Sequence, residues 1–187
     1  MRKITFLTMA IVALSLFWVS CNKEEKAVSP PAPGNEFLTT VKLVATNIAD
    51  TADVQTAKWV DLNPNGGTPD LSHATLNLRK NAKYNVQVFF MDESKSPAED
   101  ITTEIRDRAN YHLICYGIYS GLNLSVKRTD KDTNVPALEL GLTADFTTGD
   151  ISAGNLEVSL HHQPNVKNGD CERGSTDADV NFTINIL

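Results

Sequence analysis

The chain has 187 residues and a formal net charge of −6. Residues 1–20 have the pattern of a removable leader whose only charges are Arg2 and Lys3, so 15 of the 17 basic residues and all 23 acidic ones remain, a net charge of −8. This length suits one domain with a tail, and 41% apolar with 21% charged residues excludes a disordered or integral membrane chain. The acidic balance disfavours nucleic acid as a partner, because phosphate backbones repel it.

Residues 1–20 are predicted to be a lipoprotein signal peptide. The apolar run from Ile4 to Val19 is about 16 residues long, shorter than the roughly 20 that span a bilayer and typical of a signal-peptide core. It ends in Ser20-Cys21, which resembles the lipobox of bacterial lipoproteins, although Trp18 stands where leucine is usual. That resemblance implies a lipid on Cys21 and cleavage before it. The alternative is an ordinary secretory signal followed by a chance cysteine.

Residues 21–36 are predicted to be a flexible tether. They contain three prolines and no apolar periodicity, so they lack the side chains that build a core. The lysines and two glutamates of Asn22–Lys26 resemble the signal that sends Bacteroidota-type lipoproteins to the outer face of the outer membrane. The alternative is a solvated linker on a lipoprotein that faces the periplasm.

Residues 37–187 are predicted to fold as an all-β domain. Apolar and polar residues alternate, which gives each strand one buried and one wet face. Many short strands with turns between them favour an antiparallel β-sandwich of the immunoglobulin or fibronectin-III Greek-key type. The alternation is clearest in the last strand, 180–186. Other strands are predicted around 41–45, 74–78, 84–90, 111–119, 122–126, 138–142 and 156–160.

One short helix is expected to connect the strand at 84–90 to the strand at 111–119. Ser96-Pro97-Ala98-Glu99 has the pattern of a capping box with proline at the first helical position. Ile101, Ile105 and Ala109 follow at helical spacing, which predicts about 10–13 helical residues.

Leu78 and Tyr84 have the spacing of a tyrosine corner, a feature of immunoglobulin-like and fibronectin-III domains. In that arrangement the phenol bonds to the backbone of the preceding turn. Lys80 stands where proline is frequent.

Cys115 and Cys171 are the cysteines that remain once Cys21 is assigned to lipid. Outside the cytoplasm such a pair can oxidise, which would pin the loop around Cys171 to the sheet. The alternative is a buried thiol at Cys115 and a separate exposed thiol at Cys171.

Three histidines, His112, His161 and His162, are the candidate ligands for zinc or copper. Adjacent strand residues point to opposite faces, so His161 and His162 chelate one ion only if the strand ends at Pro164. His112 opens its own strand and could meet one of them. The alternative is a set of strand-end histidines with no metal.

Asp50-Thr51-Ala52 resembles the short O-glycosylation acceptor motif of Bacteroidota-type exported proteins, which makes Thr51 a candidate attachment site. The sequence contains no glycine-rich phosphate loop, no nucleophile elbow and no catalytic Cys–His arrangement. We therefore expect no enzyme and name no catalytic residue. A hydrolase that uses carboxylates such as Glu99, Glu104 or Asp177 is an alternative.

Three segments together resemble a family of small, mostly uncharacterised Bacteroidota-type lipoproteins: Glu99–Ile105 leading to His112, Leu160–Lys167 and Gly174–Phe182. Genes of that family often lie beside those of TonB-dependent receptors, which implies an accessory that binds or hands over a nutrient. The family's acid-rich segment before the histidine is replaced here by 106–110, which contains two arginines.

These expectations give two functional hypotheses. The first is a lipid-anchored outer-membrane protein, facing the cell exterior, that binds a ligand for a TonB-dependent transporter. The second is an adhesion or structural β-sandwich without a small ligand. A concave site near the histidines would favour the first, and a broad apolar patch the second.

Overall fold

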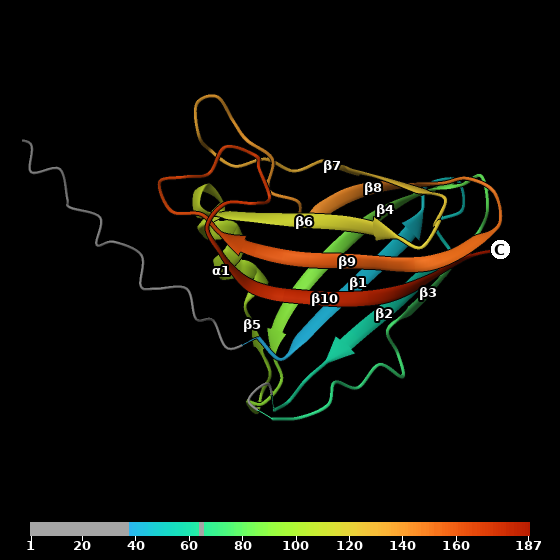
Figure 1. The fold of residues 1–187 in the computed structure, drawn as a ribbon, viewed down its shortest axis with the longest axis horizontal. Coiled ribbons are helices and arrows are strands. Elements are labelled where there is room, and N and C mark those ends of the chain that lie inside the picture. The colour runs from blue at the N-terminus through green and yellow to red at the C-terminus, as the bar shows by residue number, and fades with distance from the viewer. Residues whose placement is uncertain (1–37, 64–65) are drawn as a thin grey trace, which may run out of the picture. The chain divides into compact units, whose positions relative to one another are not determined.

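The computed structural model describes residues 38–63 and 66–187. The predicted signal peptide, the lipidation site Cys21 and the tether all lie outside these residues. In the described part, two β-sheets pack face to face (Figure 1). The predicted fold class, an all-β sandwich with one short helix, is confirmed.

The first sheet has the strand order β2-β1-β4-β8-β7, and the short β5 pairs with the C-terminal end of β4. Its strands are β1 (Thr40–Asn47), β2 (Val54–Val60), β4 (Lys83–Asp92), β5 (Glu99–Asp100), β7 (Leu124–Arg128) and β8 (Thr143–Thr148). All of its pairs are antiparallel.

The second sheet has the order β3-β10-β9-β6. Its strands are β3 (Thr75–Leu78), β6 (His112–Tyr119), β9 (Ser152–His162) and β10 (Ser175–Ile186). β3 pairs with β10 in parallel, whereas the other pairs are antiparallel. The sandwich is therefore not antiparallel throughout.

The core lies between the sheets, where the predicted alternation is confirmed. Along β10 the apolar residues at even positions from Val180 to Ile186 are at most 4% exposed. They face residues such as Phe90 on β4 and Phe146 on β8, both fully buried. Alternation places every second side chain in this layer, where burial of each stabilises the fold by about 1.5–3 kcal/mol.

The strand predicted around 138–142 is absent. This segment forms part of the connection from β7 to β8, and only an isolated bridge between Lys131 and Glu139 has strand character. Leu140 and Leu142 are nevertheless buried. Asp130 provides backbone and side-chain oxygens for the N–H groups of 140–142, so these leucines are buried without a β-ladder.

The predicted capping box is also wrong. Glu99 and Asp100 pair with β4 instead of entering a helix, and α1 (Thr102–Asp107) has six residues, followed by the 3₁₀ turn η2 (Ala109–Tyr111). The backbone N–H of Thr102 donates to Asp100 Oδ1 at 2.9 Å. The apolar spacing does hold, because Ile105 is fully buried against the core.

The tyrosine corner is present. Tyr84 is fully buried, its hydroxyl accepts a hydrogen bond from the backbone N–H of Arg79 at 2.9 Å, and it donates to Asp53 Oδ2 at 3.1 Å. The phenol thus joins the turn before β4 to the segment before β2. Burial, followed by the contact with Asp53, raises the pKa of Tyr84, so the hydroxyl keeps its proton.

Candidate binding site at the loop end of the sandwich

Three connecting segments meet at the end of the sandwich where β6 begins and β9 ends (Figure 1). They are the helical connection 102–111, the β7–β8 connection 129–142 and the β9–β10 connection 163–174. Hydrogen bonds join each of them to another: Asn110 Oδ1 accepts from the backbone N–H and the hydroxyl of Thr133, both at 3.0 Å.

A buried ion pair connects all three segments. Lys167 Nζ lies 2.9 Å from Asp132 Oδ2 and donates to the carbonyl of Ala109 at 2.8 Å. The two side chains are 2% and 0% exposed. Asp132 also accepts hydrogen bonds from Asn134 and from the backbone N–H of Leu138. Burial alone would raise the pKa of Asp132, but the hydrogen bond from Lys167, followed by those from Leu138 and Asn134, holds this pKa below its ordinary value.

The segment 163–174 is closed on itself by Gln163, which is fully buried. Its side-chain Nε2 donates to the carbonyls of Asp170 and Arg173, both at 2.8 Å. The Gln163 side chain therefore satisfies two backbone carbonyls in a loop that forms no β-sheet hydrogen bonds of its own.

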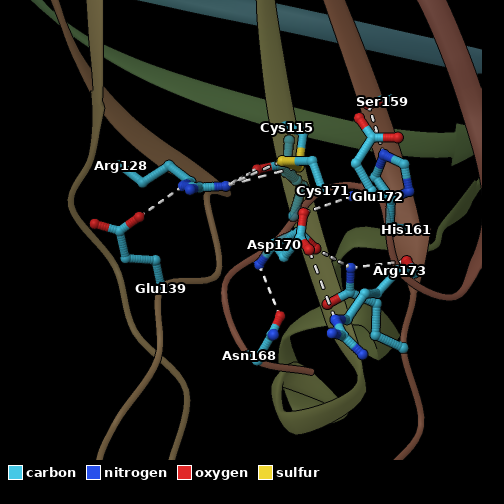
Figure 2. The surroundings of a disulfide bond; sticks show 12 residues. Cys115, Arg128, Glu139, Ser159, His161, Asn168, Asp170, Cys171, Glu172 and Arg173 are labelled. Atoms are coloured by element: carbon cyan, nitrogen blue, oxygen red, sulfur yellow. Dashed lines mark hydrogen bonds and ion pairs between the residues drawn. A yellow bond between two sulfur atoms is a disulfide. The ribbon is translucent and has the colours of Figure 1, made fainter. Parts of the chain in front are cut away.

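A disulfide joins this same loop to β6 (Figure 2). Cys115 and Cys171 have their Cα atoms 6.1 Å apart. Ile114 belongs to the core, so Cys115 faces the outer side of the sheet, where the loop covers it. Of the two alternatives left by the sequence, the structure contains the bond, and Cys115 is buried by the loop instead of by the core.

Arg128 braces the disulfide from the opposite sheet (Figure 2). Its Nη1 lies 3.7 and 3.8 Å from the two sulfur atoms and donates to the carbonyl of Ile114 at 3.1 Å. Its Nε donates to Glu139 at 2.7 Å. The guanidinium therefore ties β7 and the β7–β8 connection to β6.

The braced segments surround an open hollow of about 560 Å³. Four asparagines line it, together with Tyr111, three apolar residues and Lys167. The asparagines are Asn110, Asn134, Asn165 and Asn168, and the apolar residues are Val135, Pro136 and Leu138. The ammonium of Lys167 is directed into the pair with Asp132, so the described wall presents amides and apolar groups without an unpaired charge.

Two of the three candidate histidines meet at the same end of the sandwich, although neither lines the hollow. His112 and His162 are register partners on β6 and β9, and their rings stack with centroids 5.0 Å apart. Arg108 lies against both, through its carbonyl to His112 Nδ1 and its Nη2 to His162 Nε2. Burial, then the neighbouring His162, lowers the pKa of His112 to about 4, so its ring is neutral at pH 7.

His161 points to the other face of the sheet, as the alternation requires, and its Nε2 is 2.9 Å from Ser159 Oγ. The three histidines therefore do not converge. Within residues 38–63 and 66–187, no group of three or more His, Cys, Asp or Glu side chains is arranged to hold a metal ion.

Carboxylates that could complete a metal site around these histidines, Asp92, Glu93 and Asp177, do not come together in the described residues. Asp92 accepts hydrogen bonds from Ser94, and Glu93 pairs with Lys58. Asp177, on β10, lies near His161 and His162, and burial raises its pKa.

Thr51 lies in the exposed turn between β1 and β2. The neighbouring Asp50 forms an ion pair with Arg79. Thr51 itself is exposed, as a modification site requires. No helix in the described residues is long and apolar enough to cross a membrane.

Comparison with family models, curated proteins and solved structures finds no match for this chain. Sequence reasoning did not find the asparagine-lined hollow. The only signal was that asparagines recur in three polar connections, and nothing in their spacing indicated that these connections meet.

Proposed function

We propose that the protein is a surface lipoprotein of the outer membrane that binds a small ligand in the loop-end hollow and supplies it to a TonB-dependent transporter. The observation that carries the proposal is the braced hollow of about 560 Å³. The lipobox-like Ser20-Cys21 and the family resemblance support the anchor and the partner.

The volume suits a small-molecule site, since such sites occupy roughly 300–1,000 Å³. The walls are fixed before any ligand arrives, because Lys167 joins all three segments through Asp132 and the carbonyl of Ala109, and the Cys115–Cys171 disulfide holds segment 163–174 to β6. A preformed wall lowers the entropic cost of binding.

Large exposed apolar side chains give little support to the adhesion hypothesis. Ile48, Leu71 and Ile151 lie in three different connections, between β1 and β2, β2 and β3, and β8 and β9. Single exposed apolar residues are normal on a protein surface.

The proposal is tested by metabolic labelling with palmitate and by affinity capture of the tagged full chain from outer membranes of its native host. We expect label on the protein and copurification of an outer-membrane receptor. Cys21→Ser should lose both. Cys171→Ser is the control for the label alone, since it removes a cysteine and leaves Cys21 in place. Label on the Cys21→Ser protein, or capture of no outer-membrane protein by the wild type, would refute the proposal.

A further inference from the structure

We infer that the loop-end hollow binds a neutral carbohydrate. This inference rests on the proposed function and specifies the chemical class of its ligand. It follows from three properties of the wall: its charge, its hydrogen-bonding groups and its apolar surface.

The charge of the wall favours a neutral ligand. Lys167 is the single Lys, Arg, Asp or Glu residue among the described lining residues, and its Nζ is occupied by Asp132 and by the carbonyl of Ala109. A phosphate, a carboxylate or an organic cation would therefore lose its hydration without meeting an opposite charge in the wall. That exchange is unfavourable for an ion.

The asparagine side chains offer both donors and acceptors. Asn110 accepts at Oδ1 from Thr133, and Asn168 accepts at Oδ1 from the backbone of Asp170, so the Nδ2 donor of each lacks a partner in the described chain. Asn134 is fixed the other way: its Nδ2 donates to Asp132, and its Oδ1 is left as an acceptor among the described residues.

These bonds also orient the amides before a ligand binds. Sugar hydroxyl groups each donate and accept, and they require a partner surface of this mixed kind. Two amide donors and one amide acceptor at fixed positions fit such a ligand better than a group that only donates or only accepts.

The apolar part of the wall fits the C–H faces of a sugar ring. Val135 is 99% exposed, and Pro136 and Tyr111 line the same hollow. A ring placed on these side chains would cover apolar surface that otherwise faces water. Because Val135 packs against no other part of the domain, it is available to contact a ligand.

A peptide is the other neutral polar ligand to consider. Peptides that are held through their backbone commonly pair with a strand edge. Here the polar groups are side-chain amides on three connections, and β6, the neighbouring edge strand, is occupied near the hollow because Ile114 donates to the carbonyl of Leu140. The observations therefore favour the carbohydrate.

The test is isothermal titration calorimetry of the purified protein with three sets of probes: neutral oligosaccharides of glucose, galactose, mannose and N-acetylglucosamine; uronic-acid oligosaccharides; and uncharged tripeptides. We expect binding of at least one neutral oligosaccharide. Val135→Asp should weaken that binding at least tenfold without affecting folding, since this side chain makes no contribution to the core. Asn134→Ala should also weaken it. Asn181→Ala, an exposed asparagine on β10, is the matched control.

The inference would be overturned if none of the neutral oligosaccharides bound, if the acidic or peptide probes bound more tightly, or if Val135→Asp left the affinity unchanged. The proposed function is tested separately by capture of the receptor. A protein that copurifies with an outer-membrane receptor but binds no neutral sugar would refute the carbohydrate assignment alone.

Discussion

The buried ion pair between Lys167 and Asp132 should contribute far more to stability than an ion pair at the surface. Removing one partner of a buried pair typically costs about 3–5 kcal/mol, because the other charge stays buried. In Lys167→Met the carboxylate keeps its hydrogen bonds from Asn134 and Leu138, so we expect a loss near 3 kcal/mol, the lower end of that range. In Asp132→Leu the ammonium keeps only the Ala109 carbonyl, so we expect a loss of about 5 kcal/mol.

Urea unfolding followed by circular dichroism measures these free energies of unfolding. The double variant Lys167→Met/Asp132→Leu should be more stable than Asp132→Leu, since it leaves no uncompensated charge. Arg173→Met is the matched control from the same loop, because its pair with Asp170 is about half exposed and should contribute at most about 1 kcal/mol. A loss below about 1 kcal/mol in Lys167→Met, equal to that of the control, would refute the reasoning.

Three further predictions concern the same fold. Cys171→Ser should lower the free energy of unfolding by up to about 4 kcal/mol, since the disulfide spans a sequence separation of 56, and a reducing agent should destabilise the wild type but not the variant in thermal melts. The folded state lowers the pKa of His112 from 6.5 to about 4, so the unfolded chain binds a proton first as the pH falls. The free energy of unfolding should therefore drop by about 3 kcal/mol between pH 6.5 and 4 and then level off. In urea unfolding, His112→Gln should flatten this part of the pH profile, and an unchanged profile would contradict the lowered pKa of His112. Tyr84→Phe should cost about 1.5–3 kcal/mol in urea unfolding, because it removes an acceptor for Arg79 and a donor to the Asp53 carboxylate, and a cost near zero would exclude the corner as a stabilising contact.

Much of the fold was predictable because the burial of a strand residue follows from its position in an alternating pattern. β10 and β4 fulfil this expectation along their whole apolar stretches. The segment 138–142 has the same pattern, yet its leucines are buried by a connection whose N–H groups bond to Asp130. The capping box failed for a similar reason, since Glu99 and Asp100 pair with the C-terminal end of β4, beyond the residues that pair with β8. In both places a partner from a neighbouring segment, outside the local pattern, replaced the local preference.

The candidate site was only partly predictable. The opposite orientation of His161 and His162 follows from strand geometry alone, and so does the meeting of His112 with one of them once β6 and β9 are neighbours. The convergence of the four asparagines required the tertiary structure, because they lie on three connections separated by up to 58 positions in the sequence.

The amino-acid sequence by itself determined the class of fold and the strand faces, because these depend on local patterns of apolar and turn residues. Only the tertiary structure decided that β3 runs parallel to β10, that Cys171 reaches Cys115 and that Lys167 enters a buried pair with Asp132. Those features depend on which distant segments are neighbours, and the short range of hydrogen bonds and ion pairs makes them sensitive to that arrangement alone.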